Sequence, residues 1–213
     1  MMKIDIKHNF AAVEAKVRGM QEDIGKRALA SAMNKSIEQA RTQMTREIAG
    51  EFNVTAGFVR ERLRIRRASA RRGLRLEAEL IGGRSDRRRS MNIIHFVERS
   101  TTLAAARRRA KAGTLKQLFV KIKRKGAARP LEGAFIGNKG RTVFERVPDK
   151  QMASRAGPLN KHTQAIAPVQ VIDVAQMFNT RRINRVVVAK LVAEFPRIFD
   201  SEARYFIQRF NQK

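Results

Sequence analysis

The stretch AAVEAKVRGMQEDIGKRALASAMNKSIEQARTQMTREIA, residues 11–49, carries apolar side chains that recur every three to five positions, with one interval of seven. This spacing places them on one face of an α-helix, which turns once in about 3.6 residues. The apolar positions are Val13, Val17, Met20, Ile24, Ala28, Ala32, Ile37, Met44 and Ile48. Gly19 and Gly25 each weaken a helix by roughly 1 kcal/mol relative to alanine, so we expect a bend or a break near them. The stretch therefore predicts a long helix, capped by Asn9, whose apolar face packs into the core.

A strand pattern precedes this helix, and a second helix pattern follows it. Met2, Ile4 and Ile6 alternate with polar residues, which is the period of a half-buried strand. The segment NVTAGFVRERL, residues 53–63, predicts a short helix with Thr55 as its N-cap, because a threonine hydroxyl can accept a hydrogen bond from the first turn.

Farther along the chain the period changes from helical to extended. Leu74, Leu76, Ala78 and Leu80 alternate with Arg75, Glu77 and Glu79. This alternation predicts a strand with one buried face, and its expected partner is the segment 63–67. The segments MNIIHFV, residues 91–97, and LKQLFVKIKRK, residues 115–125, predict further strands, the latter with Val120 and Ile122 facing inward.

The last part of the chain is predicted to be helical. Residues 148–168 show no period, and we expect an extended connection there. The segment VQVIDVAQMFNTRRINRVVVAKLVAEF, residues 169–195, has the spacing of a helix. Pro196 must kink that helix or restart it, because proline has no amide proton to donate. Residues 197–210 then add a last amphipathic helical segment.

Together the patterns predict an α+β fold, in which a long N-terminal helix and C-terminal helices pack on a mainly antiparallel β-sheet with basic loop insertions. A length of 213 residues suits one domain. Its expected parts are an N-terminal strand and helices over 1–62, a β-rich basic region over 63–147, the connection over 148–168, and C-terminal helices over 169–213.

Charge is the most unusual property of the composition. The chain has 46 lysines and arginines against 19 acidic residues, a net charge of +27. Residues 60–125 alone hold 22 basic residues against five acidic ones. Such a surface repels itself and attracts anions: nucleic acid, acidic proteins or an anionic membrane surface. There is no cysteine and no apolar run long enough to span a bilayer, and the first residues lack the apolar core of a signal peptide, so we expect a cytosolic origin.

The glycine-rich segment GAFIGNKGRTVFER, residues 133–146, raises the question of nucleotide binding. A phosphate-binding loop needs four residues between its first two glycines, and a serine or threonine after the lysine. Here three residues separate Gly133 from Gly137, and Lys139 is followed by Gly140. The motif GNKG instead suits a hairpin turn, because asparagine and glycine tolerate positive φ.

No other pattern in the sequence indicates catalysis. His8, His95 and His162 have no metal-ligand spacing, and His95 and Glu98 would point to opposite faces of the predicted strand. Paired carboxylates for acid–base work are not visible. We therefore expect no catalytic, cofactor-binding or metal-binding residues, no cofactor, and no enzymatic activity.

The candidate functional residues are instead basic. Arginine binds phosphate bidentately and stays protonated, so clustered arginines suit permanent contact with an anion. The predicted nucleic-acid-facing or anion-facing set is Arg87, Arg88, Arg89, Arg107, Arg108, Arg109, Lys123, Arg124 and Lys125. The alternative is that each is an ordinary solvated surface residue.

Three segments, in this order along the chain, resemble the phage minor tail protein Z family, the tail completion proteins of long-tailed phages and prophages. They are RALASAMNKSIEQARTQMTREIAGEFNVTAGFVRERLRIRRAS, RPLEGAFIGNKGRTVFERV and GPLNKHTQAIAPVQVIDVAQMF. The closing FPRIFDSEARYFIQRF is also similar in kind. The arginine-rich stretches at 87–89 and 107–109 depart from the family pattern as enlargements.

The resemblance implies a structural virion protein that completes the head-proximal end of the tail, at the neck, after assembly in the host bacterial cytoplasm. Its implied partners are copies of itself in a ring, expected to be a hexamer, together with the tail terminator and tail tube proteins. The double-stranded DNA of the genome end would lie close by, and no membrane is involved. Without a reading helix or interleaved aromatic residues, any DNA contact should ignore sequence.

Two other classes remain open on the residues alone. A free, sequence-non-specific nucleic-acid-binding protein would carry a similar charge, and it would bind any duplex as a monomer or dimer. A nuclease would need an acidic metal cluster, which the sequence does not show.

Overall fold

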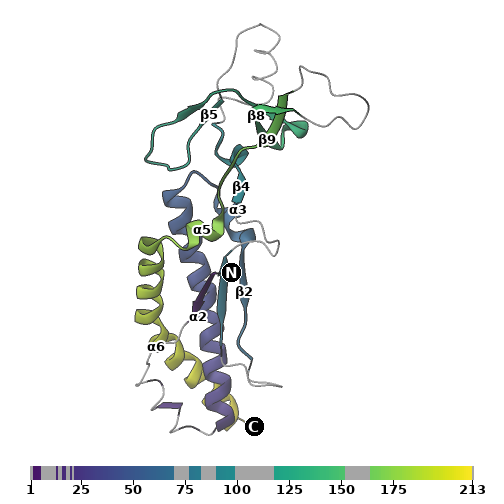
Figure 1. Cartoon of the computed structure of the whole chain (residues 1–213). Helices are drawn as coiled ribbons and strands as arrows, with labels where there is room; N and C mark the ends of the chain where they lie inside the picture. The colour runs from purple at the N-terminus through teal and green to yellow at the C-terminus, as the bar shows by residue number, and fades with distance from the viewer. Residues whose placement is uncertain are drawn as a thin grey trace. The chain divides into compact units, whose positions relative to one another are not determined.

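The computed structural model describes residues 2–5, 13, 16–17, 20, 22–69, 77–82, 90–98, 118–151 and 164–212 (Figure 1). The chain divides into two compact units. The first comprises Met1–Ala49, Thr55–Arg87 and Val174–Lys213, and the second comprises Gly50–Val54 and Arg88–Asp173. The predicted α+β class, with a long N-terminal helix, a long C-terminal helix and small antiparallel sheets, is confirmed. That the whole chain acts as one domain stays a prediction.

Two long helices dominate the first unit. Helix α2 spans Glu22–Glu51, with its last two residues assigned to the second unit, and helix α6 spans Arg181–Asn211. The shorter helices are α3, Ala56–Arg62, and α5, Val174–Phe178. The side chain of Thr55 accepts a hydrogen bond from the amide of Phe58 at 3.3 Å, which confirms Thr55 as the N-cap of α3.

The core between α2 and α6 joins small side chains on one helix to large ones on the other. Ala28 and Ala32 of α2 are fully buried in one cluster with Phe195 and Phe199 of α6. Farther along α2, Ile37, Met44 and Ile48 are buried as well. The apolar face predicted for residues 11–49 therefore lies in the core, and alanines allow the two helices to approach closely.

The helix predicted over 11–49 is broken near Gly19, as the sequence suggested, since Val13, Lys16 and Val17 are helical before the break. The backbone bends at Met20, and helix α2 starts at Glu22. Of the two glycines, Gly25 lies inside the helix, where a Cβ atom would come 3.2 Å from Cγ1 of Val17. The bend lies next to Gly19, which is outside the described residues, as is the predicted cap Asn9.

Helix α6 continues through Pro196, so the predicted restart is wrong. Proline removes one backbone hydrogen bond and disfavours a helix interior by about 3 kcal/mol. Phe195 and Phe199, on either side of the proline, are both buried, and their burial offsets this penalty. Figure 1 shows the axis of α6 changing direction between its two halves, as the predicted kink requires.

A three-stranded antiparallel sheet completes the first unit. Its strands are β1, Met2–Asp5; β2, Leu63–Arg66; and β3, Glu79–Gly82, in the order β1-β3-β2. The predicted pairing of segment 63–67 with the strand ending near residue 80 is confirmed, with Leu63 opposite Gly82. A Cβ atom on Gly82 would lie 2.9 Å from Cγ of Phe178, so only glycine fits beneath α5.

Strand β3 is buried on both faces, not on one. Glu79 was expected to face solvent, yet it is 2% exposed. Arg66 stands directly opposite on β2, and its guanidinium lies 3.3 Å from the Glu79 carboxylate. The cross-strand ion pair provides the compensation that a buried carboxylate requires.

The second unit is built from short strands. They are β4, Ser90–Asn92; β5, Leu118–Val120; β6, Arg129–Leu131; β7, Ala134–Gly137; β8, Thr142–Gln151; β9, Gln164–Pro168; and β10, Gln170–Ile172. The pairings are β10 with β4, β5 with β6, and β7-β8-β9, all antiparallel.

Three predictions for this unit are wrong in part. The strand expected at 91–97 ends at Asn92, and Ile93–Phe96 form a 3₁₀ helix, η1. Residues 170–172, expected to be helical, form β10. The connection expected at 148–168 instead includes the end of β8 and all of β9. Residues 93–96 and 170–172 are short segments, whose conformation depends on a partner distant in sequence.

Asn92 joins three segments of the second unit through its side chain. Its Oδ1 accepts hydrogen bonds from the amides of Val143, at 2.8 Å, and Ile94, at 3.1 Å. Its Nδ2 donates to the carbonyls of Val143 and Val169, each at 3.0 Å. The side-chain amide of Asn92 thus bonds to the backbone of β8 as a neighbouring strand would, and it also caps η1.

Candidate anion-binding surfaces

The nine basic residues predicted from the sequence divide into two groups. Arg87, Arg88, Arg89, Arg107, Arg108 and Arg109 lie outside the described residues. Lys123, Arg124 and Lys125 lie in the turn that follows β5, and all three are exposed. The structure therefore brings together only the last three, which we call the basic turn. The inward-facing Val120 is buried as predicted, and Ile122 is half-buried.

Backbone hydrogen bonds fix the basic turn against residues 51–54. The amide of Arg124 donates to the carbonyl of Glu51 at 2.9 Å, and the amide of Asn53 donates to the carbonyl of Ile122 at 2.8 Å. The amide of Gly126 closes the turn on the carbonyl of Lys123 at 3.1 Å. Because three hydrogen bonds hold the backbone of the basic turn in place, its side chains project from a fixed backbone.

The three side chains of the basic turn differ in their partners. Lys123 Nζ lies 3.9 Å from the carboxylate of Glu51, a long ion pair in which the lysine is mostly exposed. Among the residues that the structure describes, Arg124 and Lys125 have no side-chain partner. These two cations are available to an external anion.

A second basic surface was not in the predicted set. It comprises Arg60, Arg62, Arg64, Arg66 and Arg67, on α3 and β2, and we call it the arginine strip. Arg64 and Arg66 are exposed and share one face of β2, since side chains two apart on a strand point the same way. The dense run RERLRIRR could have indicated it.

Most of the arginine strip is held by the protein itself. Arg66 pairs with Glu79, and Arg67 donates to Glu38 at 2.8 Å. Arg62 lies over the Phe58 ring, 3.5 Å from its centroid, in a cation–π contact. Arg60 and Arg64 are exposed and have no partner within the described part of the chain. The strip is therefore partly structural, and two of its five cations lack a partner in the part of the chain that the structure describes.

The glycine-rich segment forms the hairpin turn that the sequence predicted. Strands β7 and β8 pair on either side of it, with Gly137 opposite Thr142. Asn138, Lys139 and Gly140 all have positive φ, at 49°, 53° and 89°. This left-handed geometry explains the asparagine and the glycine, and it makes the segment a turn between strands.

Of the three histidines considered in the sequence, His8 and His162 lie outside the described residues. His95, expected on a strand opposite Glu98, is exposed on η1. Among the described ranges, no group of three histidines, cysteines or acidic residues could hold a metal ion. No helix in those ranges is long and apolar enough to cross a membrane.

One buried carboxylate, Glu202 on α6, ties the two long helices together. It is 5% exposed and accepts hydrogen bonds from Ser31 Oγ at 2.6 Å and Lys35 Nζ at 2.5 Å. Burial raises the pKa of Glu202, but the hydrogen bonds from Lys35 and Ser31 and the charge of Lys35 outweigh it, so the pKa is lowered.

This shift predicts a loss of stability in acid. An unfolded glutamate has a pKa of about 4.3, so the stabilisation by Glu202 is fully present above that pH and disappears as the pH falls through the lower folded pKa. Urea unfolding from pH 7 down to pH 3 should show wild type and Glu202→Gln converging in stability as the pH falls. A constant difference across this range would contradict the assignment.

The family model described as prophage minor tail protein Z (GPZ) matches residues 11–209. No curated protein and no solved structure gives a significant match.

Proposed function

The chain belongs to the prophage minor tail protein Z family, and on that premise we propose that it completes the head-proximal end of a phage tail. As a member of a phage tail protein family, it is a component of the virion. The protein would lie at the neck, next to the tail terminator and tail tube proteins. There it would form a ring of copies that is assembled in the host cytoplasm. The match over residues 11–209 supports this role.

We further propose that the ring contacts an anion, the DNA of the genome end. A net charge of +27 on each copy makes a ring strongly self-repelling unless a large anion lies beside it. The basic turn supports this contact, because Arg124 and Lys125 project from a hydrogen-bonded backbone and have no partner among the described residues. Arginine keeps its proton at any physiological pH, so the contact would be permanent.

Three variants test the DNA contact. The turn variant replaces Lys123, Arg124 and Lys125 with glutamine. The loop variant replaces both arginine triplets, 87–89 and 107–109, with glutamine as well. The matched control replaces Arg181, Arg185 and Arg197, three exposed arginines of α6 without described partners. Retention of double-stranded DNA is measured at several salt concentrations, because each phosphate contact contributes about 0.9 to the slope of log affinity against log salt.

The slope should fall by about 2 to 3 in the turn variant and stay near the wild-type value in the control. Phage carrying the turn or loop variant should also lose infectivity. Equal slopes in the turn variant and the control would overturn the DNA contact.

The tail role is tested separately, by assembly of the purified protein with a tail terminator or tube protein. A chain that binds any duplex but never assembles would be a free nucleic-acid-binding protein.

A further inference from the structure

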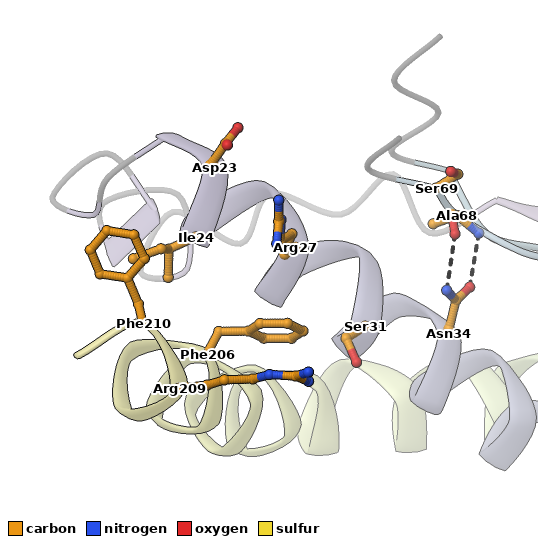
Figure 2. A pocket seen from close by; sticks show the side chains of 10 residues that line it. All are labelled: Asp23, Ile24, Arg27, Ser31, Asn34, Ala68, Ser69, Phe206, Arg209 and Phe210. Carbon is orange, nitrogen blue, oxygen red and sulfur yellow. Dashed lines mark hydrogen bonds between the residues drawn. The ribbon is translucent and has the colours of Figure 1, made fainter. Parts of the chain in front are cut away.

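A groove in the first unit lies between the N-terminal half of α2 and the C-terminal end of α6 (Figure 2). It encloses about 750 Å³, within the size range of sites that bind a small ligand or a few side chains. Its lining includes Arg27 and Asn34 from α2, Ala68 beyond β2, and Phe206, Arg209 and Phe210 from α6. Neither the proposed tail role nor the basic turn uses this groove.

The floor of the groove is apolar and partly uncovered. Phe206 packs against the core cluster of α2 and α6, and its ring meets that of Tyr205 edge to face at 5.2 Å. Phe210 is 53% exposed, and Ile207 and Tyr205 beside it on α6 are exposed as well. Large apolar side chains gathered on one exposed helix end are typical of an interaction site.

Two guanidinium groups stand at this floor. Figure 2 shows the Phe206 ring between Arg27, from α2, and Arg209, from α6, whereas Asp23 points away from the ring. Arg27 has no partner among the described residues, and Arg209 donates only to the hydroxyl of Tyr205, at 3.0 Å. Both side chains are exposed, so both can donate hydrogen bonds to a carboxylate without first breaking an ion pair within the described residues.

The far wall of the groove is rigid. Asn34 on α2 donates to the carbonyl of Ala68 at 3.0 Å and accepts from the amide of Ala68 at 2.8 Å. This two-bond clamp, drawn in Figure 2, holds the chain beyond β2 against the helix. A pre-formed wall lowers the entropy lost when a ligand binds.

We propose that this groove binds an acidic peptide segment of another protein. An apolar side chain of the segment packs on Phe206 and Phe210, and a neighbouring carboxylate binds Arg27 and Arg209. Charge selects the partner, because two guanidinium groups without a carboxylate partner among the described residues favour a segment that carries carboxylates. A duplex is excluded by the apolar floor, since a phosphate backbone offers nothing to cover two phenylalanine rings.

The probe is a short synthetic peptide in which glutamate alternates with leucine and phenylalanine. The chain has no tryptophan, so Phe210→Trp places a single fluorescent reporter in the groove.

Two charge reversals are compared on this background. Arg27→Glu lies in the groove, and Arg204→Glu lies on the exposed face of α6 outside it. Both variants have the same net charge, so non-specific attraction to the peptide is equal. Urea midpoints equal to the parent's confirm that both fold.

Peptide binding should shift the tryptophan emission to the blue. Arg27→Glu should weaken the affinity about tenfold or more, the loss expected for a charge-assisted hydrogen bond, while Arg204→Glu changes it less than twofold. A peptide with glutamine in place of glutamate should bind as weakly as the Arg27→Glu variant binds the original. Equal weakening by both reversals would overturn the proposal. The proposal would also be overturned if a single-stranded oligonucleotide shifted the tryptophan emission and the peptide did not. The titration needs no phage particle, so its failure leaves the tail role untouched.

Discussion

Replacing Asn92 with aspartate is expected to lower the free energy of unfolding of the second unit by about 3 kcal/mol. The substitution keeps the shape of the side chain but changes its two donors into an acceptor. The carbonyls of Val143 and Val169, each 3.0 Å from Nδ2, would then face a negative charge. Urea unfolding followed by circular dichroism measures the loss, and amide exchange at Val143 locates it, since that amide donates to Asn92.

The matched control is Asn138→Asp, the same chemical change in the exposed hairpin turn. It should alter stability by less than about 0.5 kcal/mol, as surface substitutions usually do. Lowering the pH below about 4 protonates the new carboxyl and restores one donor, so the Asn92→Asp defect should shrink there. Equal effects of the two substitutions would show that the Asn92 contacts do not hold the three segments together.

Replacing Phe199 with alanine is expected to destabilise the first unit by about 3–5 kcal/mol, the usual result of removing a buried phenylalanine. Phe199 is fully buried between α2 and α6, and the alanines opposite it are too small to fill the space. Because most native domains are stable by only about 5–15 kcal/mol, the variant should unfold at a much lower temperature. Thermal unfolding by calorimetry measures the shift.

Phe210→Ala is the control for this prediction, since Phe210 is 53% exposed on the same helix. Its removal should change the melting temperature by no more than a degree or two, because little apolar surface is uncovered. If Phe199→Ala melted like Phe210→Ala, the packing of α6 on α2 would not be the main source of stability in this unit.

Local signals in the sequence predicted much of the fold. The apolar face of residues 11–49 fixed the orientation of α2, Thr55 marked the start of α3, and GNKG marked a hairpin. Each of these depends on side chains that are neighbours along the chain, so the pattern and the structure share one cause. The pairing of β2 with β3 was also predicted, because the two strands are neighbours along the chain.

The errors came where distant segments decide the conformation. Residues 93–96 are apolar enough for a strand, but Asn92 caps a 3₁₀ helix there while it bonds to Val143 and Val169, far along the chain. Residues 170–172 resemble the start of a helix, but β4 takes them as a strand partner. Neither partner can be read from local periodicity.

For the candidate surfaces, the density of charge was evident from the sequence, but which cations have partners was not. In the arginine strip, Arg66 pairs with the buried Glu79, whereas Arg64 has no partner within the described residues. That difference depends on strand register, which places Arg66 opposite Glu79. The groove beside Phe206 was likewise invisible, because α2 and α6 supply its two sides from opposite ends of the chain.

The segments of the first unit lie on both sides of the main segment of the second unit along the chain. During synthesis, the apolar face of α2 can therefore pack on Phe195 and Phe199 only after residues 88–173 have been made. The central unit can fold earlier, because its main segment is contiguous. A product that terminates before α6 would lack the partner helix, so the apolar face of α2 would stay exposed to solvent and to proteases.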